Sequence, residues 1–361
     1  MKILFITLEQ SGNEILKTIL NDNFFKDNQH SIYTFGLNEN YKGIKDLTNM
    51  NIKPLMGVSD ILFNLFYLFK LRRSINFLIQ LKDINHVFFI DSFDFTKFYL
   101  KKFLNKKIFY YQIVGPSVFI WKKNRAKFIN NNIKGIFSIF EIERSFYDPK
   151  IYNFIGHPLI NKVKLNYNYS NNITNIGIFL GSRFQEISKH IKVVKELINK
   201  LQSYDQYNYF FFTTPIFDSL IKKNFSNLNN SKFILNNNYY YENISKLDFA
   251  FACSGTVHLE LSFSHIPHFI FYKASKFNFI IFKFFVKSNF LSLINIFNKK
   301  LIIKEFVQQN FTSEIIFKNF LDLLLGSNLI EYRDNMISSL KKSNLQSYRP
   351  NIITDYLKKF F

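Results

Sequence analysis

Short runs of apolar, β-branched and aromatic residues recur along the chain, with stretches of helical periodicity between them. Over residues 184–201, apolar side chains fall at helical spacing and charged side chains lie between them. This alternation predicts an α/β fold in which parallel sheets carry helices on both faces. The expected strands are Lys2–Leu8, His86–Ile90, Ile108–Val114, Gly135–Phe140, Asn175–Leu180, Asn208–Thr213, Lys232–Leu235, Leu247–Ala252 and His268–Tyr272.

The polar, Asn-rich segment Asn161–Thr174 separates two such series, and we interpret it as an interdomain linker. A length of 361 residues is ample for two domains. We expect a first domain over 1–160 and a second over 161–330. Residues 331–361 are expected to form a helical tail, for which packing back on the first domain is one option.

Cysteine and hydropathy patterns indicate the compartment. The single cysteine, Cys253, excludes an internal disulfide framework and fits a reducing environment. The N-terminal sequence has too short an apolar run for a signal peptide and is typical of a buried strand. No window reaches the roughly 18 uncharged apolar residues of a spanning helix. The nearest approaches are Val58–Phe69 and Phe277–Phe297, so we expect no membrane crossing.

Basic residues are in large excess, with 47 Lys and Arg against 26 Asp and Glu, which gives a formal net charge of +21. Phe, Ile, Lys, Asn and Tyr dominate the composition, and these residues have AT-rich codons, so part of the charge reflects codon drift. A basic nucleic-acid-binding protein is one alternative. The charge is spread along the chain and no RNA-binding aromatic signature occurs, which disfavours it.

A glycine-containing loop predicts an anion site in the second half. In IFLGSRFQE a strand ends at Gly181, Ser182 can cap the next helix, and Arg183 lies in its first turn. A helix N-terminus beside an Arg suits a phosphate. For any single loop of this kind, an ordinary strand-to-helix turn is the simpler interpretation.

A second loop of the same kind follows a later strand. In FAFACSGTVHLE, Ser254, Gly255 and Thr256 offer hydroxyl and N–H groups to another anion, and Glu260 can accept hydrogen bonds from a ribose diol. The two loops together are typical of a diphosphate site with a sugar-binding carboxylate. Neither a P-loop nor a G-x-G-x-x-G pattern occurs, which disfavours a dinucleotide-dependent oxidoreductase.

Carboxylates follow the strands of the first half. Asp91 and Asp94 end the strand in FFIDSFDFT, where a carboxylate can act as a general base, although Asp91 alone suggests a loop or helix-cap residue. Glu9, Ser11 and Asn13 follow the first strand and face the same crevice in this layout.

The histidines give no metal pattern. His258, His265 and His268 lack a cysteine or acidic ligand array, so we expect no metal. His157 in IGHP remains a candidate site residue.

Taken in order, the motifs resemble one family, the lipid-A-disaccharide synthases. Leu8 and Asn13 replace the Gly and Asp of the family's G-E-x-S-G-D, Asp60 replaces Glu in M-G-x-x-E-V-L, and Phe93 replaces Pro in I-D-x-P-D-F. Pro116, Ser117, Val118, Trp121 and Arg125 match its P-S-V-W-A-W-x-x-x-R stretch. The remaining matches, which extend to about Thr312, are FEIERSFYD, IGHPL, LGSRFQEI, CSGTVHLEL, PHFIFYKAS, LSLINIF and KEFVQQNFT.

The resemblance implies a GT-B fold, with two Rossmann-like domains whose parallel sheets face a central crevice. It implies an inverting transfer from UDP-2,3-diacylglucosamine to 2,3-diacylglucosamine 1-phosphate, giving a β-1,6-linked disaccharide and UDP in lipid A biosynthesis. By resemblance Asp94 is the candidate base, although the choice between Asp94 and Asp91 stays open. The resemblance implies no cofactor or metal. The candidates for binding the diphosphate are Arg183, Ser254, Gly255, Thr256 and Lys273, Glu260 is the candidate for the ribose, and Asn295 lies in a site motif of the family. The candidates on the acceptor side are Glu9, Ser11, Gly12 and His157.

Acylated substrates imply a lipid surface. Val58–Arg73 is strongly apolar and ends in the cationic cluster Lys70, Arg72 and Arg73, which is typical of an interfacial helix. We expect Phe63, Phe66 and Phe69 to contact anionic lipids at the cytoplasmic face of the inner membrane, while Phe277–Lys287 fits a membrane or a core helix equally well.

Expected partners are the two acylated sugars and these lipids, without nucleic acid. A homodimer is an open option, and a UDP-sugar epimerase is the second enzyme reading.

Overall fold

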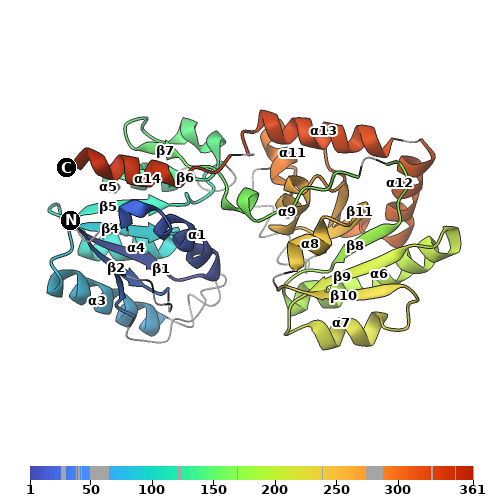
Figure 1. Cartoon of the computed structure of the whole chain (residues 1–361), viewed down its shortest axis with the longest axis horizontal. Coiled ribbons are helices and arrows are strands. Elements are labelled where there is room, and N and C mark those ends of the chain that lie inside the picture. Colours follow the sequence, from blue (N-terminus) through green and yellow to red (C-terminus); the bar gives the residue numbers. More distant parts are fainter. Residues whose placement is uncertain are drawn as a thin grey trace. The chain divides into compact units, whose positions relative to one another are not determined.

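The computed structural model describes residues 1–25, 30–37, 39, 41, 43–48, 65–119, 124–168, 170–237, 239–273, 288–326, 328–345 and 347–360. The chain divides into two compact units (Figure 1). Unit 1 comprises residues 1–158 and 347–361, and unit 2 comprises residues 159–346.

Unit 1 contains a seven-stranded sheet with the strand order β3-β2-β1-β4-β5-β6-β7, and every paired strand is parallel. The strand order reverses direction between the neighbouring strands β1 and β4. The strands are β1 Lys2–Thr7, β2 Ser31–Phe35, β3 Ile44–Asp46, β4 His86–Ile90, β5 Phe109–Ile113, β6 Gly135–Ser138 and β7 Tyr152–Phe154. The helices are α1 Gln10–Leu20, α3 Leu65–Leu81, α4 Phe93–Phe103, α5 Asn124–Asn132 and α14 Asn351–Leu357, with 3-10 turns η1 Asn23–Phe25, η2 Glu141–Phe146 and η5 Lys358–Phe360.

Both faces of this sheet are covered by apolar side chains. On one face, Leu4 and Phe89 pack in a cluster with Leu71 of α3 and Tyr99 of α4. On the other face, Phe88 stacks on Phe5 and Tyr111, and Tyr356 of α14 makes an edge contact with Tyr111. Each buried aromatic or aliphatic side chain contributes about 1.5–3 kcal/mol relative to exposure. The near-continuous apolar runs of these strands therefore specify a sheet that is buried on both faces.

Unit 2 has a six-stranded parallel sheet with the order β10-β9-β8-β11-β12-β13, which reverses direction between β8 and β11. The strands are β8 Asn175–Phe179, β9 Asn208–Thr213, β10 Ser231–Leu235, β11 Phe249–Cys253, β12 His268–Tyr272 and β13 Glu305–Val307. The helices are α6 Phe184–Tyr204, α7 Asp218–Phe225, α8 Tyr240–Ile244, α9 Val257–Phe263, α11 Leu293–Asn298, α12 Ser313–Leu325 and α13 Leu329–Lys342, with 3-10 turns η3 Pro158–Asn161 and η4 Gln308–Asn310.

The helix expected over residues 184–201 is present as α6. Its apolar stripe, which includes Ile187, Val194 and Ile198, packs with strand residues and with Phe320 of α12 in one core cluster. The opposite face of the sheet carries a smaller cluster, in which Phe212 packs near Leu261 of α9. The apolar stripe of α6 is therefore the face of the helix that packs against the sheet.

The segment expected as a linker is docked on unit 2. Asn166 is 4% exposed, its backbone N–H donates to Ser264, and its carbonyl accepts from the guanidinium of the buried Arg333 of α13. The division between the units falls between Pro158 and Leu159. The expected tail is itself divided, since α13 belongs to unit 2 and residues 347–361 to unit 1.

Candidate functional site

Each sheet has one point at which the strand order reverses, and in open parallel sheets ligands bind beyond the carboxyl ends of the strands at such a point. In unit 1 the reversal lies between β1 and β4, which lead to Glu9 and Asp91. In unit 2 it lies between β8 and β11, which lead to Arg183 and Ser254. The sequence candidates therefore concentrate at two equivalent places in the fold.

A hydrogen-bonded cluster of carboxylates and hydroxyls occupies the reversal point of unit 1. The Ser11 hydroxyl donates to Asp91 Oδ2 at 2.8 Å, and the Ser92 hydroxyl donates to Glu9 Oε1 at 2.6 Å. Burial raises the pKa of Glu9, and the charge of Asp91 adds to the shift, while the Ser92 hydrogen bond opposes it. Gly12 permits this close approach, since an added Cβ would lie 2.5 Å from Thr7 Oγ1. The structure thus brings Glu9, Ser11 and Asp91 together.

Asp94 lies apart from this cluster, in the first turn of α4. Its carboxylate is exposed and accepts two hydrogen bonds from Arg125 Nη2, at 3.0 Å and 2.9 Å. Arg125 Nη2 therefore holds both oxygens of Asp94 in a charge-assisted pair on the surface of unit 1.

The loop after β5 and the turn η2 form the neighbouring part of unit 1. Glu143 of η2 is fully buried, and its Oε2 accepts the Ser138 hydroxyl at 2.6 Å. Burial raises the pKa of Glu143 to about 7, although the Ser138 hydroxyl and the backbone N–H groups of Val118 and Ser117 lower it. An added Cβ at Gly115 would lie 2.5 Å from Glu143 Oε2, so the loop approaches the carboxyl closely.

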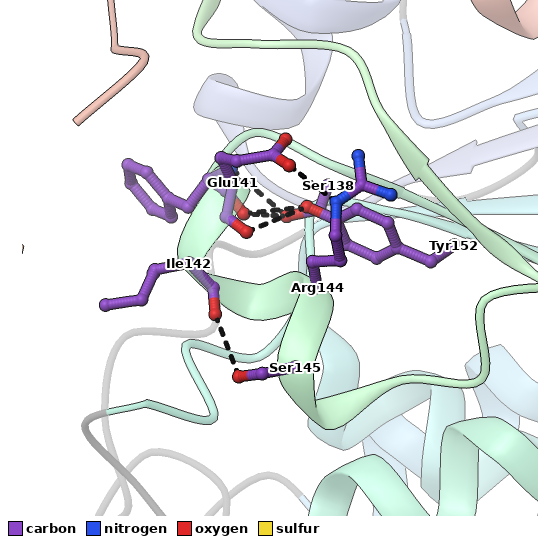
Figure 2. Close-up of polar contacts among 7 residues, drawn as sticks. Ser138, Glu141, Ile142, Arg144, Ser145 and Tyr152 are labelled. Carbon is purple, nitrogen blue, oxygen red and sulfur yellow. Dashed lines mark hydrogen bonds and ion pairs between the residues drawn. The ribbon is translucent and has the colours of Figure 1, made fainter. Parts of the chain in front are cut away.

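The outer side of η2 is held by a separate set of contacts (Figure 2). Arg144 donates to Glu141 Oε1 at 2.5 Å, and its guanidinium lies 4.8 Å from the ring centre of Tyr152. The Tyr152 hydroxyl donates to the Phe140 carbonyl at 3.0 Å. These contacts fix η2 against β7 and thereby hold Glu143 inward.

His157 is placed away from the carboxylate cluster. It is 8% exposed, its backbone N–H donates to Ser347, and its ring lies 5.7 Å from that of Phe140. The preceding Gly156 has a φ of 78°, and an added Cβ there would overlap the Ser347 carbonyl. The Gly156–His157 pair therefore serves the return of the C-terminal segment to unit 1.

A pocket of about 440 Å³ lies at the reversal point of unit 2. It brings together five of the sequence candidates with several residues that the sequence did not single out. Arg183 Nη1 donates to Glu186 Oε1 at 3.1 Å, and the Arg183 side chain remains 65% exposed. The lining residues that carry chemistry are Ser182, Arg183, Glu186, Thr213, Thr214, Asn236, Tyr240, Ser254, Gly255, Thr256 and Glu260.

Glu260 is a carboxyl group that lines this pocket. The Tyr240 hydroxyl donates to Glu260 Oε2 at 3.1 Å. Burial raises the pKa of Glu260 to about 7, while the Tyr240 hydrogen bond and the charge of Lys162 lower it. A carboxyl balanced between its two protonation states near neutral pH can accept hydrogen bonds from a diol once it is ionised.

Two buried histidines hold the loops of the pocket. His190 of α6 contacts the Leu180 carbonyl through Nδ1 at 2.8 Å, and its Nε2 accepts the backbone N–H of Lys273 at 3.1 Å. His258 of α9 contacts the Gly255 carbonyl through Nδ1, and its Nε2 accepts the backbone N–H of Leu293 at 3.2 Å. Burial lowers the pKa of both rings to about 4, which keeps them neutral as this pattern requires.

Two further candidates lie outside the pocket lining. Lys273 directly follows β12, where its backbone N–H is held by His190. Asn295 is fully buried, and its side-chain amide donates to the Ile303 carbonyl and Glu305 Oε1, both at 2.7 Å. Its Oδ1 accepts the N–H groups of Ile302 and Ile303, so Asn295 holds the approach to β13 through all of its side-chain hydrogen bonds.

The apolar segment expected at a lipid surface is described in part. Phe63 and Phe277–Lys287 lie outside the described residues. In α3, Phe66 is 86% exposed and Phe69 is 43% exposed. Among the described residues, no helix is long and apolar enough to cross a bilayer. Within the same part of the chain, no cluster of His, Cys, Asp and Glu has the arrangement of a metal site.

Some residues at these sites escaped the sequence reasoning. Glu186 occupies the third position of α6, where its Oε2 accepts the Ser182 N–H, and a helix-start pattern signals such a residue. Asn236 reaches the pocket from the loop after β10 and Tyr240 from the start of α8, and nothing in their local sequence marks them. These two residues reach the pocket only because the ends of neighbouring parallel strands lie at the same edge of the sheet.

Solved structures with the same fold define the class. The structure of UDP-GlcNAc 2-epimerase from Neisseria meningitidis superposes with a TM-score of 0.64 at 15% identity, covering 99% of this chain and 100% of that one. MurG from Acinetobacter baumannii gives a TM-score of 0.57 at 10% identity, with 99% of each chain covered. The fold is therefore GT-B, the fold of a large class of glycosyltransferases.

Sequence relatives narrow this class. Lipid-A-disaccharide synthase from Campylobacter jejuni (strain NCTC 11168) is 28% identical over 91% of both chains. Lipid-A-disaccharide synthase 1 from Legionella pneumophila (strain Lens) is 29% identical over 68% of this chain and 66% of that relative. The family model Lipid-A-disaccharide synthetase matches residues 3–352. The chain belongs to the lipid-A-disaccharide synthetase family and is a glycosyltransferase of lipid A biosynthesis.

Proposed function

We propose that the protein joins UDP-2,3-diacylglucosamine to 2,3-diacylglucosamine 1-phosphate, forming the β-1,6-linked disaccharide 1-phosphate and releasing UDP. The observation that carries this proposal is the pocket of unit 2. Arg183, the hydroxyls of Ser254 and Thr256, and Glu260 line one cavity of about 440 Å³. A cation and hydroxyl donors suit a diphosphate, and a carboxylate suits the ribose diol of a nucleotide.

Asp91 is the better candidate for the general base. Asp94 is engaged by both of its oxygens with Arg125. The Asp91 oxygens have neutral partners, since Oδ1 accepts the Ser92 N–H at 3.0 Å and Oδ2 accepts the Ser11 hydroxyl at 2.8 Å. Asp91 lies at the reversal point of the sheet, where the Ser11 hydroxyl can give way to a substrate hydroxyl. The geometry thus favours Asp91, and we assign Asp94 to the support of α4.

In this mechanism the proton and the electron pair move in one displacement. Asp91 accepts the proton of the acceptor 6-hydroxyl, and the oxygen attacks the anomeric carbon of the donor. The bond from that carbon to the UDP oxygen breaks on the opposite side, so the configuration inverts. Arg183 and the loop Ser254–Thr256 stabilise the charge that develops on the leaving diphosphate.

The decisive test uses the purified protein with both acylated glucosamine substrates. We expect equal amounts of UDP and disaccharide, and no turnover of unacylated UDP-N-acetylglucosamine. Conversion of the unacylated sugar nucleotide without disaccharide would favour an epimerase instead. Salt-sensitive retention on nucleic acid together with inactivity on all of these sugars would favour the nucleic-acid-binding alternative.

The protein is further proposed to bind the cytoplasmic face of the inner membrane peripherally through α3. Phe66, Phe69 and Phe77 are exposed on this helix together with Lys70 and Arg73. Exposed aromatic residues beside cations are typical of interfacial helices.

One member of the expected cationic cluster does not reach the surface. Arg72 is 9% exposed, its guanidinium lies 4.0 Å from the ring centre of Phe98, and it donates to the Phe98 carbonyl. The expectation that Arg72 meets lipid headgroups is therefore wrong, and Lys70 and Arg73 remain.

Flotation with anionic vesicles tests the membrane proposal. Replacing Phe66 and Phe69 with Ser should release the protein with only a modest fall in the melting temperature. Phe66 is 86% exposed, and Phe69 is 43% exposed although its ring contacts Phe98 and Arg72. The matched control replaces two exposed apolar residues of unit 2, Tyr167 and Ile216, with Ser. Equal release by the control pair, or no binding by the parent protein, would contradict the assignment.

A further inference from the structure

Backbone strain is concentrated at the carboxyl ends of β4 and β5. Ten non-glycine residues have positive φ in the described part of the chain, and four of them lie here. Asp91 and Ser92 follow β4 with φ of 58° and 38°, and Val114 and Ser117 follow β5 with φ of 65° and 41°. For a β-branched residue such as Val114 this conformation is a clear outlier. Strain of this kind persists only where the surroundings fix it, and it clusters at functional sites.

The side chain of Gln112 connects the two strained segments. Gln112 is fully buried in β5. Its Nε2 donates to the Asp91 carbonyl at 2.8 Å, to the Val114 carbonyl at 3.0 Å and to the Ile113 carbonyl at 3.2 Å. Its Oε1 accepts the hydroxyl of Thr96 of α4 at 2.9 Å. One amide therefore ties together the end of β4, the end of β5 and the first turns of α4.

The ordinary sheet ladder does not make these connections. The N–H of Asp91 donates to the Ile113 carbonyl at 2.9 Å, which is the last ladder bond between β4 and β5. Beyond it both chains turn into the left-handed region, so their carbonyls leave the ladder. The carbonyls of Asp91 and Val114 are partly buried, and the buried amide of Gln112 supplies a donor to each of them.

We propose that Gln112 is a positioning residue that holds Asp91 in its left-handed conformation and so aims its carboxylate for proton transfer. This inference rests on the proposed role of Asp91 as the base. An amide is required at this place. A carboxylate would bring an oxygen against three carbonyls, and an apolar side chain would remove the donor that Gln112 gives to the Asp91 and Val114 carbonyls.

The first experiment compares Gln112→Met with the parent protein. Methionine keeps the length and volume of the side chain and removes the amide. We expect kcat to fall by about 10²-fold, as for a catalytic group displaced by about 1 Å. The KM for the donor and the Kd for UDP should stay unchanged, because the pocket of unit 2 is untouched. Thr96→Val removes only the hydroxyl that orients Oε1, so it should lower kcat in the same direction by less.

Thr354→Val provides the matched control. Thr354 is also buried in unit 1, where its hydroxyl bonds to Asp22 and the Asn351 carbonyl, far in sequence from the base. It should lower stability with kcat retained. A Gln112→Met protein that loses stability as Thr354→Val does, with kcat retained, would show a merely structural role and overturn the inference. If Gln112→Met does not fold, an unchanged kcat in Thr96→Val overturns it.

A separate variant, Asp91→Asn, tests whether Asp91 is the base. If the Asp91→Asn variant is inactive and the Gln112→Met variant is fully active, the positioning role of Gln112 is overturned, whereas the assignment of Asp91 as the base stands. Asp91→Asn fully active overturns the base assignment and this inference with it. A large loss of kcat in both variants, with UDP affinity kept in both, supports the two together.

Discussion

The two reversal points of the sheets occupy equivalent places in their units and carry opposite chemistry. In unit 1 the strands β1 and β4 lead to the carboxylates of Glu9 and Asp91, which are held by serine hydroxyls. In unit 2 the strands β8 and β11 lead to Arg183 and to the hydroxyls of Ser254 and Thr256, in a pocket. One architecture therefore presents a carboxylate cluster, the proposed base site, in one unit and a pocket with an arginine and hydroxyls, the proposed anion site, in the other.

The two places also differ in how their backbones turn. In unit 2 the positive φ after β8 falls on Gly181, at 117°, where it carries no steric penalty. In unit 1 the same kind of turn is made by Asp91 and Ser92, which need support from neighbouring side chains. The difference teaches that the anion site can be built from loop sequence, whereas the base site depends on packed neighbours.

The largest expected effect separates the two units by function. Asp91→Asn should lower the rate of transfer by about 10²–10⁴-fold, the usual contribution of a positioned base. UDP affinity measured by calorimetry should stay unchanged, since the pocket belongs to unit 2.

Asp94→Asn is the control for this prediction. It removes an exposed ion pair with Arg125, which is worth at most about 1 kcal/mol of stability, and it should retain most activity. An inactive Asp94→Asn with an active Asp91→Asn would return the base to Asp94, and normal rates in both would remove the base from this loop.

The next effect tests the anion site. Arg183→Ala should weaken UDP binding by about 1.5–3 kcal/mol, the value of a hydrogen bond to a charged group, and the rate at low donor concentration should fall accordingly. Arg144→Ala is matched to it, because Arg144 also forms an exposed ion pair three residues along the chain, with Glu141 in unit 1. Equal UDP affinity in the two variants would contradict the assignment of the pocket.

The smallest effect is a pH dependence in the pocket. The pKa of Glu260 is raised to about 7, so the carboxyl is protonated in more acidic solution and ionised in more alkaline solution. Only the ionised form accepts from both ribose hydroxyls, and UDP affinity should therefore rise with pH through about 7. The gain should be about 1 kcal/mol, as for a hydrogen bond.

Glu260→Gln isolates this contribution, because the ionisation of UDP itself is common to both proteins. The ratio of parent to variant affinity should increase between about pH 6 and pH 8. Tyr240→Phe removes the hydrogen bond that lowers the pKa of Glu260, so its rise in affinity should move to higher pH. A pH-independent ratio for Glu260→Gln would contradict the ribose role.

Elements with strong apolar patterns were predictable from the sequence. The strands β4, β9 and β12 begin and end at the predicted residues, and α6 extends the predicted helix by one turn. The short edge strands β3, β7 and β13 were not predicted, because strands of three residues carry too few positions for a period to show. β2 of five residues was also missed.

The candidate site was predictable to the extent that it lies in loops next to strands. Gly181, Arg183, Ser254 and Thr256 were marked by glycine and hydroxyl patterns, and the structure gathers them in one pocket. Arg72 and Asn295 were read as available for ligands, whereas both side chains are buried with protein partners. The local sequence does not indicate which polar side chains are buried in the folded protein.

By itself, the sequence determined the α/β class, most of the strands and the loop chemistry at both reversal points, because periodicity and turn residues act over a few positions. Only the tertiary structure decided which polar groups meet. The bond between Ser11 and Asp91 spans 80 residues, and that between Tyr240 and Glu260 spans 20. The partners of Gln112 come from two strand ends and a helix, and parallel pairing alone brings these together. The order of the strands thus turned separate loop motifs into two sites of different chemistry.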